Sequence, residues 1–539
     1  MNRKSSSYVS FDAKLTNDSS QIGQPDNLKG YVDTPTNQPV SAVFRSAVQD
    51  VLAVVQEKVG LLDRAISQSH DPSDSQIRLE HRDQCAALID RLKIIIAPHK
   101  RLPAELLAHI FYSTLPDDFR VHVPGRLFKL DTGGRLPWSF GHICSFWRQV
   151  ALTDYRLWNR IQIHVEYSKP LHRQLLETVL LRSGSAPLDI EMKADHSFIS
   201  VSDVVLPQAG RISRLKLRAY PGNFSPFLCN FSMPGQTLSF LTEATLFGYH
   251  LEIPDGGLRI FGDCPLLRKL EIYLCRRQSG LLKALHSLHV PFSQLTELTL
   301  HIRSSPHTIL CILKDTPNLV RCSITSRDFV CIDDPAFDLV LPHLENLKLL
   351  SDELEILIRI LRHIIPPSLL QLNAECPSAW RTSNALPTTV LALINRSSCH
   401  LTHIKLKGDL TPIIERSHCS LVSIDTVFAA LPASTAQQIA RRELILPHLE
   451  KLRCALDLDT FTDLKAMVEA LWSDGDGTRG SAVRRMFCSK CKIASVSTAG
   501  EEDFNRWEEE MKVLLKRLSI DGWVEFLGDE EQSDDDFFF

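Results

Sequence analysis

The side chains that most resemble a chemical site in this 539-residue chain are two cysteines, Cys488 and Cys491. Their Cys-x-x-Cys spacing is typical of zinc binding or of thiol redox chemistry. A zinc site would need a second pair of cysteine or histidine ligands nearby, and none follows in the sequence. The other cysteines are scattered from Cys85 onward, which is typical of small buried hydrophobic side chains in a reducing compartment. We therefore expect no metal site and no cofactor.

Enzymatic chemistry is not indicated by any sequence motif. The chain lacks a Gly-x-Gly-x-x-Gly segment after a strand, a Walker loop, His-Glu-x-x-His and Gly-x-Ser-x-Gly. Its net charge of −4 gives no reason to expect a nucleic acid or an anionic membrane as partner. No apolar run approaches the roughly 18–20 residues of a membrane span, and the N-terminus has no apolar segment typical of a secretory signal. We expect a non-enzymatic protein of the cytoplasm, the nucleus or both.

A compact apolar module is predicted over residues 98–163. Pro103 suits the first position of a helix, because its missing N–H would have no partner there. Apolar residues then recur at helical spacing, a second helix is expected after Ser139, and a third short apolar segment follows Asp154. Three helices within about 60 residues bury little surface. Their apolar faces either dock on the rest of the chain or need a partner protein.

The order of residues in this module resembles an F-box, as found in F-box proteins with irregular leucine-rich repeats that are common in basidiomycete fungi. The matching phrases are Leu-Pro-x-Glu-Leu-Leu-x-x-Ile-Phe, Ile-Cys-x-x-Trp-Arg-x-x-Ala-Leu and Arg-Leu-Trp. The resemblance implies a three-helix module that binds a Skp-type adaptor and, through it, a cullin. By position, the first contact surface would comprise Leu102, Pro103, Leu106, Leu107, Ile110 and Phe111. The second surface, or the module's own core, would comprise Ile143, Cys144, Trp147, Ala151, Leu157 and Trp158.

The connection between the two phrases, residues 116–137, is longer than in many F-boxes. A loop of this length closes at a modest entropic cost, so the resemblance to the module persists.

The part before the module is predicted to contain two segments. Residues 1–40 are rich in Ser, Asn, Asp, Gln and Pro and are expected to be disordered. Apolar residues then step by three and four from Phe44, and again from Ile77 after a helix-breaking segment at residues 69–75. This spacing predicts a helical hairpin or short coiled coil over residues 41–97. Intramolecular packing is favoured over dimerisation, because two or three heptads are too short to indicate a coiled coil.

A repeating aliphatic–x–x–aliphatic–x–aliphatic pattern follows the module. The middle residues at positions 215, 244, 270, 298, 322 and 347 lie 24 to 29 residues apart, near the period of a leucine-rich repeat. Helices are expected between strands at residues 279–287 and 353–364. The pattern resembles irregular leucine-rich repeats, which implies a solenoid over residues 164–460 with its strands in one parallel sheet. The expected fold class is therefore mixed α/β. The repeat blurs after Leu372, since the copies at positions 404 and 452 are 48 residues apart.

The end of the chain is predicted to close this solenoid. Residues 461–527 would form a C-terminal cap, with helical spacing from Phe504 to Leu518 and a last strand at residues 522–527, and residues 528–539 an acidic tail.

Two functions remain open from the sequence. The first is a substrate receptor of a Skp–cullin–F-box ubiquitin ligase, which positions an unknown protein target near a ubiquitin-charged enzyme. The second is a non-catalytic leucine-rich-repeat scaffold without ubiquitin-ligase association. Target binding would use side chains that alternate outward from the strands, although such side chains can also be merely solvated. The examples are Lys216, Glu271, Thr299, Lys348 and Lys405.

Overall fold

The computed structural model of the chain describes residues 41–68, 71–97, 102–123, 137–165, 170–194, 203–219, 228, 237–249, 259–277, 281–327, 337–377, 384–456 and 485–490, with isolated positions between 463 and 513. The chain divides into two compact units. The first comprises Met1–His122, Leu127–Ile161 and Leu175–Ala186, and the second comprises Val123–Arg126, Gln162–Gln174 and Pro187–Phe539. The predicted disordered segment, most of the predicted cap and the acidic tail lie outside the described residues.

The first unit begins with two packed helices, α3 (Ala42–Gln68) and α4 (Pro72–Ile95). Asp71 caps α4 because its side chain accepts a hydrogen bond from the Ser73 N–H at 2.9 Å. The end of the segment at residues 69–75, which was expected to break the helix, therefore forms the first turn of α4. At one end of the pair, fully buried side chains form a small core with half-buried neighbours: Val48, Leu92, Ile95, Phe44 and Val51.

Within residues 102–123 and 137–161, the described part of the F-box-like module, there are two α-helices and two 3₁₀ helices. The elements are α5 (Ala104–Ser113), η2 (Trp138–His142), α6 (Ser145–Thr153) and η3 (Tyr155–Leu157). Strand β1 (Val121–Val123) lies within the long connection, and β2 (Arg160–Val165) follows η3.

Three local expectations for this module are wrong. Pro103 caps α5 in an extended conformation instead of occupying its first turn. The second helix begins at Ser145 and not after Ser139, because the Cys144 sulfur accepts a hydrogen bond from the Trp147 N–H at 3.3 Å and so supplies the cap. The third predicted helix is only one 3₁₀ turn, after which the chain enters β2.

The second unit contains most of a large parallel sheet, as the sequence predicts for its fold class. Among the described residues, the strands from β3 onward pair in parallel in the order β3-β4-β5-β6-β7-β8-β10-β12-β13-β14-β15-β16. Their bounds are β3 Leu188–Ala194, β4 Ile212–Ala219, β5 Glu243–Gly248, β6 Lys269–Arg277, β7 Glu297–Arg303, β8 Arg321–Ser326, β10 Asn346–Ser351, β12 Gln371–Glu375, β13 His403–Leu406, β14 Ser423–Ala430, β15 Lys451–Leu456 and β16 Arg485–Lys490. Strands β9 (Leu339–Val340) and β11 (Ile364–Ile365) pair separately.

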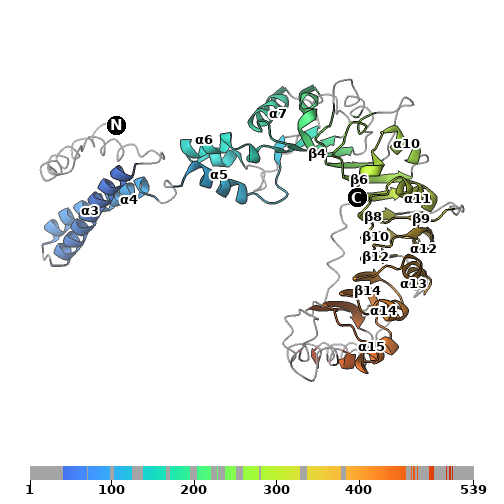
Figure 1. Ribbon diagram of the computed structural model, residues 1–539. Helices are drawn as coiled ribbons and strands as arrows, with labels where there is room; N and C mark the ends of the chain where they lie inside the picture. The colour runs from blue at the N-terminus through green and yellow to red at the C-terminus, as the bar shows by residue number, and fades with distance from the viewer. Residues whose placement is uncertain are drawn as a thin grey trace. The chain divides into compact units, whose positions relative to one another are not determined.

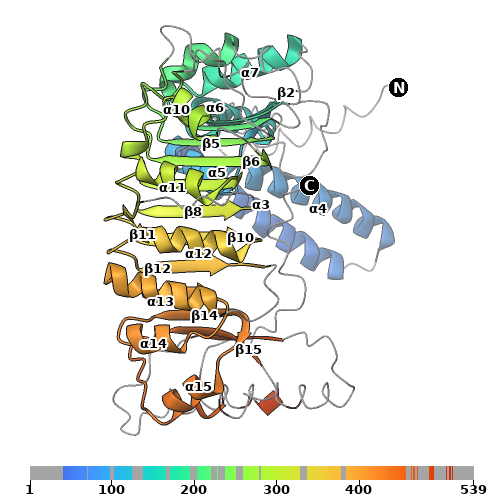
Figure 2. The same ribbon diagram turned by 90° about the vertical axis from the view of Figure 1, so that its right-hand side faces the viewer.

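Helices between the strands cover one face of this sheet (Figure 1 and Figure 2). The helices expected at residues 279–287 and 353–364 are confirmed as α10 (Leu281–Ser287) and α12 (Leu354–His363). The aliphatic residues of each predicted strand pattern are buried on this covered face; Leu215, Leu270 and Leu300, for example, are at most 2% exposed. Such burial is the main stabilising term for a sheet of this kind. The remaining helices are α7 Pro170–Arg182, η4 Leu206–Arg211, η5 Phe292–Gln294, α11 Pro306–Lys314, α13 Ala385–Ser397, α14 Thr411–Ser417 and α15 Ala433–Ala440.

One hydrogen-bond arrangement recurs just before successive strands. The Arg268 carbonyl accepts the N–H groups of both Thr296 and Glu297, at 2.9 and 3.0 Å. Equivalent carbonyls recur every 20 to 32 residues, at positions 242, 268, 296, 320, 345, 370, 402 and 422. Side chains add to the link: Gln294 Nε2 donates to the carbonyls of Cys264 and Leu267. The turn before each of these strands is thus hydrogen-bonded to the turn before the preceding strand. These bonds give partners to backbone N–H and C=O groups that lie outside the strands.

Strand β14 explains the 48-residue interval in the predicted pattern. It lies between β13 and β15, and Leu421 and Ile424 are buried like the first two aliphatic residues of the other strand patterns. Its third position is Thr426, which is fully buried but not aliphatic, so the sequence pattern missed this strand.

Candidate functional site

The core of the F-box-like module is aromatic. Phe111 of α5 is 1% exposed and stacks on Phe140 of η2, with ring centroids 4.3 Å apart and planes 4° apart. On another side it meets Trp147 of α6 at 4.9 Å. Leu107, one turn earlier on α5, is equally buried. These contacts fix α5 against η2 and α6, and offset ring pairs add to the burial energy.

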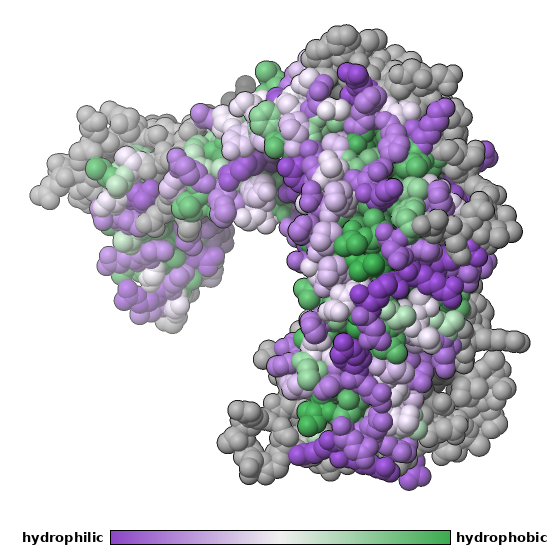
Figure 3. All heavy atoms as spheres, turned by 45° about the vertical axis from the view of Figure 1, so that its right-hand side comes forward, coloured by the Kyte–Doolittle hydropathy of each residue, from purple (hydrophilic) through white to green (hydrophobic). Residues whose placement is uncertain are grey.

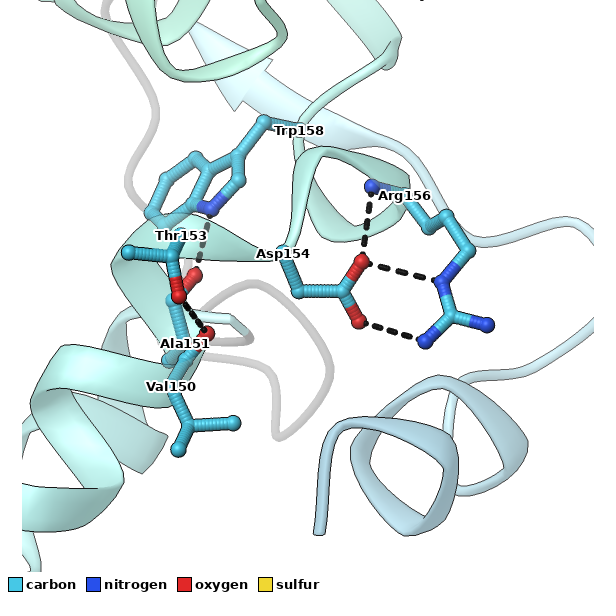
Figure 4. A network of polar contacts seen from close by, with 6 residues as sticks. All are labelled: Val150, Ala151, Thr153, Asp154, Arg156 and Trp158. Carbon is cyan, nitrogen blue, oxygen red and sulfur yellow. Dashed lines mark hydrogen bonds and ion pairs between the residues drawn. The ribbon is translucent and has the colours of Figure 1, made fainter. Parts of the chain in front are cut away.

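Trp158 closes the other side of this module. It is 1% exposed, and its indole N–H donates to the Ala151 carbonyl at 2.7 Å (Figure 4). Its ring meets Trp138 edge-on at 4.8 Å. The Arg182 guanidinium lies 4.6 Å from the Trp158 ring and 4.5 Å from the Trp138 ring, which favours a cation–π interaction. Burial lowers the pKa of Arg182.

The turn between α6 and η3 is held by an ion pair. Asp154, 9% exposed, caps η3 and binds Arg156 through two hydrogen bonds of 2.9 Å (Figure 4). Its Oδ1 also accepts the Arg156 backbone N–H at 3.2 Å. Hydrogen bonding to Asp154 raises the pKa of Arg156. At the last residue of α6, the Thr153 hydroxyl donates a hydrogen bond to the Val150 carbonyl at 3.2 Å.

Some large aliphatic side chains of the module are not covered. Leu106 and Ile110 are 52% and 41% exposed, and Ile143 is 54% exposed. Leu106 and Ile110 are four residues apart on α5, so they share one face of that helix. Single exposed apolar residues are common on protein surfaces, but a helix face of this kind is typical of a binding surface.

The structure thus sorts the residues carried over from the F-box resemblance into two sets. The exposed or half-buried set comprises Leu102, Pro103, Leu106, Ile110, Ile143, Cys144 and Trp147. The buried set comprises Leu107, Phe111, Ala151, Leu157 and Trp158. Leu107 and Phe111, expected in the first contact surface, therefore belong to the module's core because α6 and η2 pack over them.

The second unit offers a different surface, the sheet face opposite the helices. None of this unit's described helices covers that face (Figure 1). Because the strands pair in register, outward side chains form rows across the sheet. From β3 to β8 the first row is Asp189, Arg214, Glu243, Lys269, Glu297 and Arg321. The second is Glu191, Lys216, Thr245, Glu271, Thr299 and Ser323, continuing through Lys348 and Asn373 to Lys405. The third is Lys193, Arg218, Phe247, Tyr273, His301 and Thr325.

The second row brings together all five outward residues expected from the sequence. The first row consists of alternating opposite charges, with Arg214 Nε 3.1 Å from Glu243 Oε1 and a further ion pair between Arg321 and Glu297. Such cross-strand pairs stabilise a sheet modestly. The third row was not anticipated, and its aromatic members are the distinctive feature of this face.

Exposed hydrophobic side chains elsewhere on this unit are scattered. The space-filling view shows them as separate groups among hydrophilic side chains on the visible face (Figure 3). Large exposed examples are Phe240, Leu266, Val340, Leu370 and Ile445.

Among the described residues, the His, Cys, Asp and Glu side chains form no cluster of three that could hold a metal ion. Cys488 lies on β16, and Cys491 lies outside the described residues. None of the described helices is both long and apolar enough to cross a membrane.

Buried thiols should be inert in the folded protein. Burial raises the pKa of Cys264 and Cys322 to about 12, whereas thiolates are the reactive form. At about pH 8 we expect N-ethylmaleimide to modify the exposed Cys419 and to leave these two unmodified until the chain unfolds. Peptide mass spectrometry measures each site separately. Equal labelling rates for Cys322 and Cys419 in the native protein would contradict the burial.

Comparison of the chain with protein-family models and with curated proteins found no match.

Proposed function

We propose that the chain is an F-box substrate receptor of a Skp–cullin–F-box ubiquitin ligase. In this proposal the module binds a Skp-type adaptor, and the sheet unit, as an irregular leucine-rich-repeat solenoid, holds a protein target. The chain does no chemistry itself. It raises the effective concentration of the target near a ubiquitin-charged enzyme held by the cullin.

The observation that carries the proposal is the division of α5 into two faces. Leu107 and Phe111 are 1% exposed, whereas Leu106 and Ile110, each adjacent in sequence to one of them, remain about half exposed. Phe111 on the buried face already packs against η2 and α6, so the second apolar face can meet a partner helix or groove. The F-box resemblance names that partner as a Skp-type adaptor.

The recurring turns of the sheet unit support its assignment as a repeat solenoid. Each repeat contributes one strand, one carbonyl that accepts two N–H groups and, in most cases, one helix on the covered face. A repeat of this kind buries its apolar edge only against the neighbouring repeats, which is the principle of solenoid proteins.

Co-purification of the full chain with the Skp-type adaptor and cullin tests the proposal. Leu106→Asp should reduce adaptor recovery at least about tenfold, because it places a charge at the centre of an apolar contact. The matched control is Leu266→Asp, a leucine of similar exposure (43%) in the sheet unit, which should leave recovery unchanged. Both sites are exposed, so neither variant should unfold.

Two outcomes would contradict the proposal. The first is that no adaptor or cullin is recovered with the unmodified chain, which would favour a scaffold without ligase association. The second is that Leu106→Asp and Leu266→Asp recover equal amounts of adaptor.

A further inference from the structure

The third row of the open sheet face contains a stack of rings that begins at a cation. The Arg218 guanidinium lies 5.6 Å from the centre of the Phe247 ring. Phe247 meets Tyr273 at 5.8 Å with 34° between their planes, and Tyr273 stacks on His301 at 4.4 Å with 24°. These four side chains come from β4, β5, β6 and β7 in turn. We refer to them as the aromatic row.

Two buried or half-buried acids hold the aromatic row in place. Glu191, 5% exposed, lies 3.0 Å from Arg218 and 3.6 Å from Lys193. Tyr273 donates a hydrogen bond to Glu271 at 3.4 Å. Burial, with Glu271 nearby, raises the pKa of Tyr273 to about 12, so its hydroxyl keeps its proton. The row is therefore pre-organised and should lose little conformational entropy on binding a ligand.

Charge is distributed unevenly along the strands β3 to β7. The first row holds three acids and two cations, and the second row holds two acids and one cation. The third row and the strand ends beyond it contain no acid and five cations, namely Lys193, Arg218, Arg276, Arg277 and Arg303. Arg276 lies over Tyr249 at 5.5 Å, at the same end of the sheet. The aromatic row therefore lies toward the positive end of strands β3 to β7, whose first two rows together contain five acids and three cations.

The ring geometry distinguishes between classes of ligand. Phe247 lies between Arg218 and Tyr273, and Tyr273 lies between Phe247 and His301, so these two rings offer little free face for stacking nucleobases, the usual basis of single-strand binding. What remains accessible on such rings is their edges, which carry positive partial charge. Ring edges and guanidinium groups both favour carboxylates.

We propose that the aromatic row and the cations beside it, Lys193, Arg276 and Arg303, bind an extended acidic segment, rich in aspartate or glutamate, of a partner protein. This rests on the proposed function in one respect, namely that the partner is the target presented to the ligase. The distance from β3 to β7 is four strand spacings of about 4.8 Å, or about 19 Å, which corresponds to about six extended residues.

The test uses the full chain without adaptor and a fluorescent peptide of about six residues that alternates glutamate and serine. A glutamine–serine peptide is the neutral probe, and fluorescence anisotropy measures binding. We expect the acidic probe alone to bind, with an affinity that falls as the salt concentration rises.

Arg218→Gln and Arg303→Gln should each weaken binding of the acidic probe about five- to tenfold, because each removes a charge-assisted contact. Tyr273→Leu should weaken it without changing the charge. Arg321→Gln is the matched control, a cation of the first row on β8, and should change affinity less than about twofold.

Four results would overturn the proposal. They are equal binding of the neutral probe, an Arg321→Gln effect as large as that of Arg218→Gln, tighter binding of oligothymidylate than of peptide, and stronger peptide binding after removal of residues 529–539. The last result would make the chain's own acidic tail the occupant. Leu106→Asp should leave peptide binding intact, so a failure of the adaptor experiment and a failure of this one are distinguishable.

Discussion

Replacing Trp158 with alanine should lower the free energy of unfolding of the first unit by about 3–5 kcal/mol, the range for deleting a fully buried aromatic side chain. The loss exceeds the hydrophobic term alone. The Ala151 carbonyl loses its indole donor, and Arg182 keeps only the Trp138 ring as cation–π partner. Urea unfolding followed by intrinsic fluorescence and circular dichroism measures the change.

Trp158→Phe separates the two contributions. It keeps a six-membered aromatic ring but removes the N–H donor together with the five-membered ring, so the expected cost is about 1–3 kcal/mol, from the unsatisfied buried carbonyl and the smaller side chain. If Trp158→Ala costs less than about 1 kcal/mol, the ring is not the buried element that the structure shows.

Phe111→Ala should be the second large effect, also about 3–5 kcal/mol, because it removes the ring on which Phe140 and Trp147 pack. The control is Leu106→Ala, five residues earlier on the exposed face of the same helix, which should change stability by less than about 0.5 kcal/mol. The same unfolding experiment measures both variants. Equal costs would mean that α5 does not have one core face and one free face, and would remove the basis for adaptor binding.

The sheet was predictable from sequence to a large extent. Its aliphatic triplets, such as Leu298 and Leu300 on β7, are buried as expected, and α10 and α12 lie where helical spacing places them. The prediction succeeded because burial on one face imposes a pattern of period two on each strand. It missed β14, where Thr426 occupies a buried position that the pattern reserves for an aliphatic residue.

The module was predicted less accurately, for local reasons. Ser139 is a favourable capping residue in sequence terms, but Phe140 is drawn into the core by stacking on Phe111, and the segment forms a 3₁₀ helix instead. The cap is provided by Cys144, a residue type that capping preferences do not favour. Tertiary packing overrode local preference in both cases.

The aromatic row was not predicted because it depends on the register between neighbouring strands. Phe247, Tyr273 and His301 are 26 and 28 residues apart in sequence and meet only through parallel pairing of three strands. The signal was nonetheless present: Tyr273 and His301 each lie two residues after an outward residue that the pattern identified, Glu271 and Thr299. Aligning the triplets as neighbouring strands would have placed these rings side by side.

The shared carbonyls before the strands have a consequence for how such a chain can change its length. The turn before each of these strands provides one carbonyl that accepts two N–H groups of the next turn, as Arg268 does for Thr296 and Glu297. The same turn donates two N–H groups to the carbonyl of the preceding turn. Deleting one whole strand-and-helix repeat would bring together two turns whose donors and acceptors match. Deleting half a repeat would leave these donors and acceptors without their partners. Gain or loss of complete units is therefore the form of length variation that this architecture tolerates best.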